Sequence, residues 1–240
     1  MPITWILSQP LFFVAWIVAI VVTLTIHEFS HALAANYFGD DTAKQSGRLS
    51  LNPLVHVDPI GFLMMLLIGF GWAKPVPVNS YNLRRPRLAM AVISLAGPGA
   101  NLIGFIVFGI VLKILAPFLG PANLLTNFLF LLVLINVSLM LFNLIPIPPL
   151  DGSKVLFSIL PDKYADFKDK LSHYGPFVLL ILVFADSFLG FDLFGKAFGL
   201  IFSNLSIFFN FMFFNPRRPP KIPQSWPLEN PPAKRLNKGF

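Results

Sequence analysis

The chain has 240 residues, of which 55% are hydrophobic and only 12% are charged, and its mean hydropathy is +0.72. Soluble domains carry roughly a quarter charged residues, so this composition excludes an ordinary soluble domain and a disordered chain. The net charge of +7 would suggest nucleic acid in a soluble protein, but in a membrane protein the placement of Lys and Arg matters more. The chain contains no Cys, which excludes disulfides, thiolate zinc sites and a cysteine nucleophile.

Several apolar stretches approach the roughly 20 residues that a helix needs to cross a bilayer. The N-terminal ten residues hold no Lys or Arg, so the start of the chain does not look like a cleaved signal peptide. We predict an all-α multi-span membrane protein with about five transmembrane helices. The expected spans are residues 11–37, 88–115, 123–145, 174–189 and 193–214.

The segment between the first two spans, residues 39–87, is polar and irregular. The alternation of apolar and polar residues over 48–51, between a Gly and a Pro, predicts a short strand. Residues 60–72 are apolar for only about half a span, which favours a re-entrant or interfacial piece. Residues 73–79 contain two prolines in alternation, which predicts extended backbone. Short membrane-associated strand segments are therefore expected beside the helices.

The distribution of positive charge predicts the topology. Residues 39–87, residues 146–173 and the Pro-rich tail together hold every Lys and Arg except Lys113 and Lys196. Cytoplasmic segments are enriched in Lys and Arg, so we expect the N-terminus outside and the C-terminus in the cytoplasm. The expected organisation is a core over residues 1–160, an accessory segment with two C-terminal spans over 161–214, and a basic cytoplasmic tail over 215–240.

His27, Glu28 and His31 lie near the end of the first span. Helical residues four apart project from one face, so the two imidazoles can bind one zinc ion, and Glu28 can reach a metal-bound water as general base. A lone His in a span is more often a hydrogen-bonded interior residue or part of a proton path. A pair at metal spacing with a Glu reverses those odds, because zinc also provides a partner for a carboxylate that is costly in lipid.

Two histidines leave a catalytic zinc short of one protein ligand. Without Cys, and with His56 and His173 in polar segments, the remaining candidates are carboxylates. Asp151 follows the third span, which the topology returns to the membrane side where the first span ends. Alone, the Asp-Gly pair would more often be a turn or a helix cap. Beside a two-His site that needs a carboxylate, the ligand interpretation is favoured.

With these motifs the sequence resembles the site-2 protease family of intramembrane zinc metalloproteases. The likeness covers roughly residues 10–160, including the His27–His31 motif and the Asn-Leu-Ile-Pro-Ile-Pro-Pro-Leu-Asp-Gly run over 143–152. Residues 47–61, 72–79 and 96–102 resemble the bacterial branch without a large periplasmic domain. The resemblance implies a three-helix catalytic core with one zinc ion per chain. It also implies the ligands His27, His31 and Asp151, with Glu28 as base.

Other polar residues allow more than one role. Asn143 is by position a helix cap or an interhelical hydrogen-bond partner, whereas the resemblance implies that it holds the substrate or its scissile carbonyl. His56 has two possible interpretations. It is either a group near the site that supports it or acts as a pH-sensitive gate, or a loop side chain bonded to backbone. Small residues over 97–99 are expected to allow close helix approach, with interhelical hydrogen bonds from Asn101, Asn127 and Asn136.

The expected function is therefore hydrolysis of a peptide bond in or near the transmembrane segment of a membrane protein, as in regulated intramembrane proteolysis. The alternative is a membrane zinc transporter or a metal-sensing protein without hydrolysis, although a transporter usually offers polar residues along a path across several spans. The expected partners are a transmembrane protein substrate, the lipid bilayer and a regulatory membrane protein, and nucleic acid is not expected. The resemblance places the protein in the bacterial inner membrane.

Overall fold

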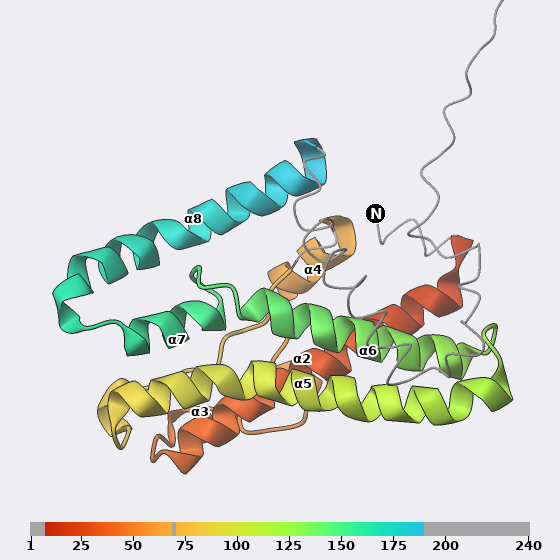
Figure 1. Cartoon of the computed structure of the whole chain (residues 1–240), viewed down its shortest axis with the longest axis horizontal. Helices are drawn as coiled ribbons and strands as arrows, with labels where there is room; N and C mark the ends of the chain where they lie inside the picture. Colours follow the sequence, from red (N-terminus) through yellow and green to blue (C-terminus); the bar gives the residue numbers. More distant parts are fainter. Residues whose placement is uncertain (1–7, 69–70, 190–240) are drawn as a thin grey trace, which may run out of the picture.

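The structure is a computed structural model that describes residues 8–68 and 71–189. Three long helices pack side by side in it: α2 (Pro10–Tyr37), α5 (Pro86–Leu119) and α6 (Leu124–Asn143) (Figure 1). In the described part of the chain, these three are long and apolar enough to cross a membrane. They confirm the first three predicted spans, with boundaries that differ by only a few residues.

The ends of these helices follow from local chemistry. Pro10 and Pro86 each stand in the first turn of their helix, where the missing N–H costs nothing. Gly120 ends α5 with a φ of 80°, a conformation that glycine adopts without steric cost. The Asn123 side chain then accepts a hydrogen bond from the Leu125 N–H at 2.9 Å, which caps α6.

The core of the bundle combines small residues on α2 with large ones on α6. Ala15 and Ala19 of α2 pack against Leu131 and Leu132 of α6. Small side chains let helix backbones approach closely, which favours association inside a membrane. A second cluster joins α5 to α6 through Phe105, Leu112, Leu129, Val133 and Val137. The outward faces stay apolar, as expected for lipid contact, with Val18, Leu33, Ile103 and Val107 exposed.

The polar connection between α2 and α5 contains only short elements: α3 (Thr42–Gln45), η2 (Pro53–Val55), α4 (Pro59–Ile68) and η3 (Ser80–Asn82). The strand predicted at 48–51 is wrong, since these residues form bends. The backbone here is held within its own loop: the Ser50 carbonyl lies 2.8 Å from Nε2 of His56, and the Asn52 side chain caps the Leu54 N–H. Within the described ranges the strand pairing is limited to one antiparallel bridge, between Val57 and Ala73.

Two other parts of this connection agree with the sequence in length and backbone, while a re-entrant or interfacial place for α4 stays a prediction. The helix α4 spans 10 residues, about half the length of a membrane-crossing helix, as its apolar run predicted. Residues 74–79 form no helix, in agreement with the extended backbone that the alternating prolines require.

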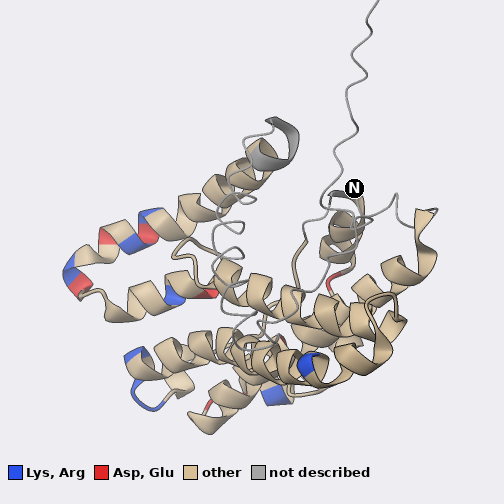
Figure 2. Ribbon diagram, turned by 45° about the vertical axis from the view of Figure 1, so that its right-hand side comes forward, with Lys and Arg blue, Asp and Glu red and all other residues tan. Residues whose placement is uncertain are grey.

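After α6 the chain forms α7 (Asp151–Ile159), η4 (Asp162–Tyr164) and α8 (Ala165–Leu189). The fourth predicted span is only the second half of α8, because the helix continues through Pro176 instead of starting near it. In both ribbon views α8 stands apart from the three packed helices (Figures 1 and 2). The predicted fifth span and the Pro-rich tail lie outside the described residues, so the count of five spans stays a prediction.

Charged side chains are nearly absent from the bundle. The helix α6 contains none, α2 contains only Glu28, and α5 contains only Arg87 and Lys113. Figure 2 shows the charges gathered mainly where α5, α7 and α8 begin. This distribution fits three membrane-embedded helices with polar connections at their ends.

Candidate metal centre

His27 and His31 occupy successive turns of α2 and face the same way, as their spacing predicted. Their Nε2 atoms lie 3.0 Å apart, and the rings meet edge to face with centroids 4.6 Å apart. Only 3% of His27 and 6% of His31 is exposed. Two imidazole nitrogens therefore converge on one point between the helices.

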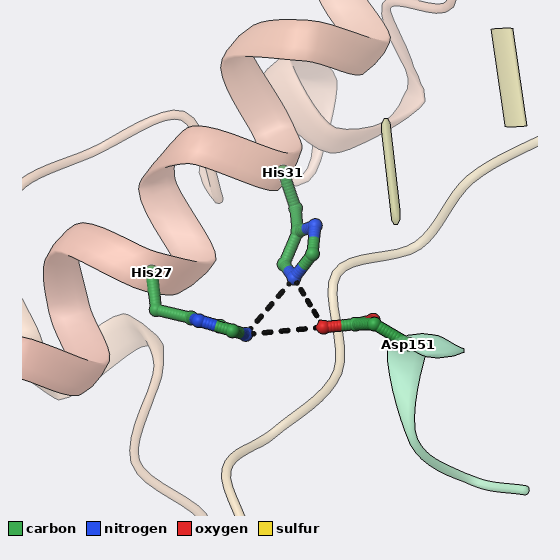
Figure 3. A group of neighbouring side chains, drawn as sticks. All are labelled: His27, His31 and Asp151. Atoms are coloured by element: carbon green, nitrogen blue, oxygen red, sulfur yellow. Dashed lines mark hydrogen bonds and ion pairs between the residues drawn. The ribbon is translucent and has the colours of Figure 1, made fainter. Parts of the chain in front are cut away.

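Asp151, the first residue of α7, completes a triangle of donor atoms (Figure 3). Its Oδ2 lies 3.2 Å from Nε2 of His27 and 3.0 Å from Nε2 of His31. Zinc bonds of about 2.0–2.2 Å in a tetrahedral site place neighbouring ligand atoms about 3.3 Å apart. The donor types, their burial and their separations fit a zinc ion, and these three residues form a group that could hold a metal.

The position of Asp151 depends on the packing of α7 against the end of α6. A Cβ atom at Gly152 would lie 2.3 Å from the Leu144 carbonyl oxygen and 2.6 Å from that of Ile145. Only glycine permits this approach. The Asp-Gly pair is thus no turn: the carboxylate points to the two histidines, and the helix N-cap is Leu150.

The tautomer of His31 is fixed by α5. Its Nδ1 lies 2.7 Å from the Ile93 carbonyl oxygen, which can only accept a hydrogen bond. Nδ1 therefore carries the proton, and the lone pair of Nε2 faces Asp151. Histidines that bind metals are held in this way by a partner on the other ring nitrogen.

Comparison with known proteins agrees with this geometry. A model of peptidase family M50 matches residues 119–183. The chain is 42% identical over 173 residues to "Putative zinc metalloprotease YwhC" of Bacillus subtilis, an alignment that covers 69% of this chain and 78% of that protein. The chain belongs to peptidase family M50, the site-2 proteases. It is accordingly a zinc metalloprotease.

The alignments with two less similar M50 relatives cover a smaller share of those proteins. The chain is 32% identical over 149 residues to "Putative zinc metalloprotease Rip2" of Mycolicibacterium smegmatis, covering 58% of this chain and 55% of that protein. It is 33% identical over 151 residues to the protein of that name in Mycobacterium tuberculosis, covering 60% and 56%. No solved structure matches the chain.

Glu28, the predicted general base of this M50 protein, lies beside the triangle on α2 with 8% of its surface exposed. No described residue holds its carboxylate by a hydrogen bond or an ion pair. The buried guanidinium of Arg48 lies within range of its charge: burial lowers the pKa of Arg48, and Glu28 partly offsets that effect. Arg48 also donates to the carbonyls of Lys74 and Pro75, so the extended segment is anchored close to Glu28.

Asp151 stays ionised although it is buried. Burial by itself would raise the pKa of this carboxyl, but the neighbouring imidazoles of His27 and His31 and the charge of Lys154 hold the pKa well below its usual range. The Nζ of Lys154 lies 3.3 Å from Oδ1 of Asp151, on the oxygen that does not face the histidines. The carboxylate therefore offers one oxygen to a metal and the other to a cation.

Four other polar residues singled out in the sequence form no hydrogen bond with the triangle. Asn143 donates from Nδ2 to the Leu139 carbonyl at 3.0 Å within its own helix, so its role toward substrate stays a prediction. His56 is fully buried and bonded to the Ser50 backbone, which confirms the loop interpretation. Asn136 donates to Thr23 of α2 at 3.2 Å, as expected of an interhelical partner, whereas the Asn127 side chain bonds no described residue.

Two parts of the site were not identified from the sequence. No residue type in the sequence indicates the role of the Ile93 carbonyl, because every residue has this backbone group. Lys154 follows Asp151 by three positions on α7, a spacing that would have shown the ion pair once residue 151 was placed in a helix.

Proposed function

We propose that this M50 protein is an intramembrane protease that hydrolyses a peptide bond in or near the transmembrane segment of a membrane protein. One zinc ion per chain would be held by His27, His31 and Asp151. The observation that carries the proposal is the triangle itself, in which Asp151 Oδ2 lies 3.0 and 3.2 Å from the two Nε2 atoms. The three residues of the triangle are buried, and two of them lie on a helix long enough to cross a membrane.

Each residue around the proposed zinc ion has a separate role in the reaction. When bound, zinc supplies a Lewis acid that polarises a carbonyl and lets water lose a proton near neutral pH. Glu28 takes up that proton on its free carboxylate and passes it to the departing amine. The Ile93 carbonyl holds His31 in the required tautomer, and Lys154 keeps Asp151 charged.

A transmembrane substrate hides its carbonyls in intrahelical hydrogen bonds, so it must be extended before it can be cleaved. We assign residues 76–78 to hold that extended stretch. Their backbone groups form no hydrogen bond with other described residues, while Lys74 and Pro75 just before them are anchored by His56 and Arg48. Val76→Pro removes one backbone N–H, and proline is compatible with extended backbone. This variant should therefore slow cleavage while it keeps its zinc, whereas Val76→Ala should cleave at the wild-type rate.

Asn143 is the second proposed substrate contact. It ends α6, and its Nδ2 is bonded within that helix, which leaves Oδ1 available toward an extended peptide. Asn143→Ala should therefore lower turnover while the zinc content stays at the wild-type level. Loss of zinc in this variant would instead assign the residue to the packing of the site.

The deciding experiment compares the wild type with Glu28→Gln in native membranes. New N-termini within transmembrane segments, profiled by mass spectrometry, should appear with the wild type and vanish with the variant, while zinc per purified chain stays near one. Identical profiles would overturn proteolysis by this site. A wild type that binds no zinc would overturn the metal assignment.

We also propose a bacterial inner-membrane location with the N-terminus outside. The lack of native Cys makes single-cysteine labelling unambiguous. Tyr81→Cys, at a 96% exposed position, should react with a membrane-impermeant thiol reagent only after the membrane is permeabilised. Ala122→Cys, between α5 and α6, should react with the same reagent from outside intact cells. The reverse pattern would invert the topology.

A further inference from the structure

Asn101 of α5 is fully buried and reaches the imidazole of His27. Its Nδ2 lies 3.1 Å from Nδ1 of His27, on the side of the ring opposite the metal triangle. The Oδ1 of the same amide is buried and has no hydrogen-bond partner among the described residues. A buried carbonyl oxygen without a donor costs about 1–3 kcal/mol, so this arrangement is unfavourable as it stands.

The proton on His27 decides whether the ring can bind a metal. A neutral imidazole has one N–H and one lone pair. If the amide N–H donates to Nδ1, then the proton must sit on Nε2, which faces Asp151 and could not bind a cation. A half-turn of the Asn101 amide about its Cβ–Cγ bond exchanges the oxygen and the nitrogen. Oδ1 then accepts the proton of Nδ1, and the lone pair of Nε2 faces Asp151.

We propose that Asn101 is a positioning residue of the metal centre whose side-chain oxygen accepts the Nδ1 proton of His27. The inference rests on the proposed zinc site. It gives His27 the same support that the Ile93 carbonyl gives His31, so α5 fixes both imidazoles from one face. Oδ1 then also gains the donor that it lacks.

An amide suits this position better than a carboxylate on electrostatic grounds. The site already contains Glu28 and Asp151, and a third negative charge would have to be buried between two apolar helices. Asn101 lies on the face of α5 that carries Ser94 and Gly97, all three of which are buried, and Gly97 and Asn101 both lie against the histidines of α2. A neutral acceptor orients the ring without adding charge.

The test measures zinc affinity by competition with a chelator on the purified full chain. Asn101→Ala should lower the affinity about 10- to 100-fold, the usual effect of losing a partner of a metal-binding histidine. Asn101→Asp, which can only accept, should recover most of that loss. If Asn101→Ala does not fold, the aspartate variant alone decides, because an acceptor role requires it to hold zinc within a few fold of the wild type.

Asn136→Ala is the matched control. Asn136 is also a buried asparagine between two helices, bonded to Thr23. Its loss should lower the apparent Tm and leave zinc affinity unchanged. The inference is overturned if Asn101→Asp loses zinc as severely as Asn101→Ala, or if Asn136→Ala weakens zinc equally. A wild type without zinc would instead refute the proposed function.

Discussion

Gly97 of α5 lies directly against the His31 imidazole: a Cβ atom at position 97 would be 2.4 Å from Nε2 of His31 and 2.6 Å from Nε2 of His27. Gly97→Ala should therefore displace both imidazoles from the point where they converge. We expect zinc affinity and turnover to fall at least about tenfold, since misplaced ligands bind metal poorly. Metal analysis of the purified variant measures zinc per chain, and circular dichroism checks separately that its helices are retained.

Gly99→Ala is the control for this substitution. It places the same residue two positions later in α5, where a Cβ atom would meet nothing within 4 Å. Alanine favours a helix over glycine by about 1 kcal/mol, so this variant should keep its zinc and be at least as stable as the wild type. Equal zinc loss in both variants would mean that α5 responds to added bulk in general, not to contact with the histidines.

Asp151→Asn should weaken zinc binding and proteolysis together, because a neutral amide is a much poorer ligand than a carboxylate. We expect turnover to fall by about 100-fold or more. Metal analysis by mass spectrometry checks the cause. Asp162→Asn changes an aspartate whose side chain is 84% exposed and ion-paired with Arg87, and it should leave the zinc content unchanged. Full zinc retention in Asp151→Asn would remove this residue from the ligand set.

Gly152→Ala should destabilise the contact between α6 and α7. The added Cβ would meet the backbone carbonyls of Leu144 and Ile145, which cannot rotate away as a side chain does. Overpacking of this kind costs about 1–3 kcal/mol, so the apparent Tm should fall by several degrees. Because α7 begins with Asp151, zinc affinity should fall as well. An unchanged Tm would show that α7 can move away from α6 at no cost.

The part of the site that could be predicted from the sequence is the part set by local geometry. The spacing of His27 and His31 on one helix places both rings together whatever surrounds them. The lack of Cys left carboxylates as the candidate third ligand, and Asp151 was chosen because the predicted topology brings the end of the third span to the side where the first span ends. Asn101 could be identified only as an interhelical partner, since the sequence does not say which turn of α5 meets His27. That register is set by packing along the whole bundle.

Two predictions about the secondary structure were wrong. The alternation over residues 48–51 satisfies a strand pattern, but a strand needs a partner, and here Ser50 and Asn52 bond within their own loop. The span predicted over residues 174–189 is part of a longer helix, because one proline within α8 removes one hydrogen bond and the helix continues through it. Local pattern determined the type of most elements, but it did not show that residues 48–51 lack a partner strand or that α8 extends through its proline.

Asp40 gives a prediction on pH, because its buried carboxylate joins the end of α2 to the segment before α5. It accepts hydrogen bonds from the backbone N–H of Asn79 at 2.7 Å, from Nδ2 of Asn82 at 3.0 Å and from the N–H of Thr42 at 3.1 Å. Burial opposes ionisation, but these donors lower the pKa of Asp40 below its usual 3.8. A lowered folded-state pKa stabilises the fold above pH 4, and the contribution is lost as the pH falls through the folded-state value.

Asp40→Asn should therefore lower the free energy of unfolding at pH 7 by about 1–3 kcal/mol, since the amide turns an N–H toward groups that are themselves donors. As the pH falls below the usual 3.8, the carboxyl of the unfolded chain takes up a proton first; the folded carboxyl follows at a lower pH and then resembles the amide. The difference in apparent Tm between the two proteins should therefore shrink between pH 7 and pH 3. The exposed Asp166→Asn should show no difference at either pH. If the difference for Asp40→Asn is the same at both pH values, the shape of the side chain and not its charge holds the two segments together.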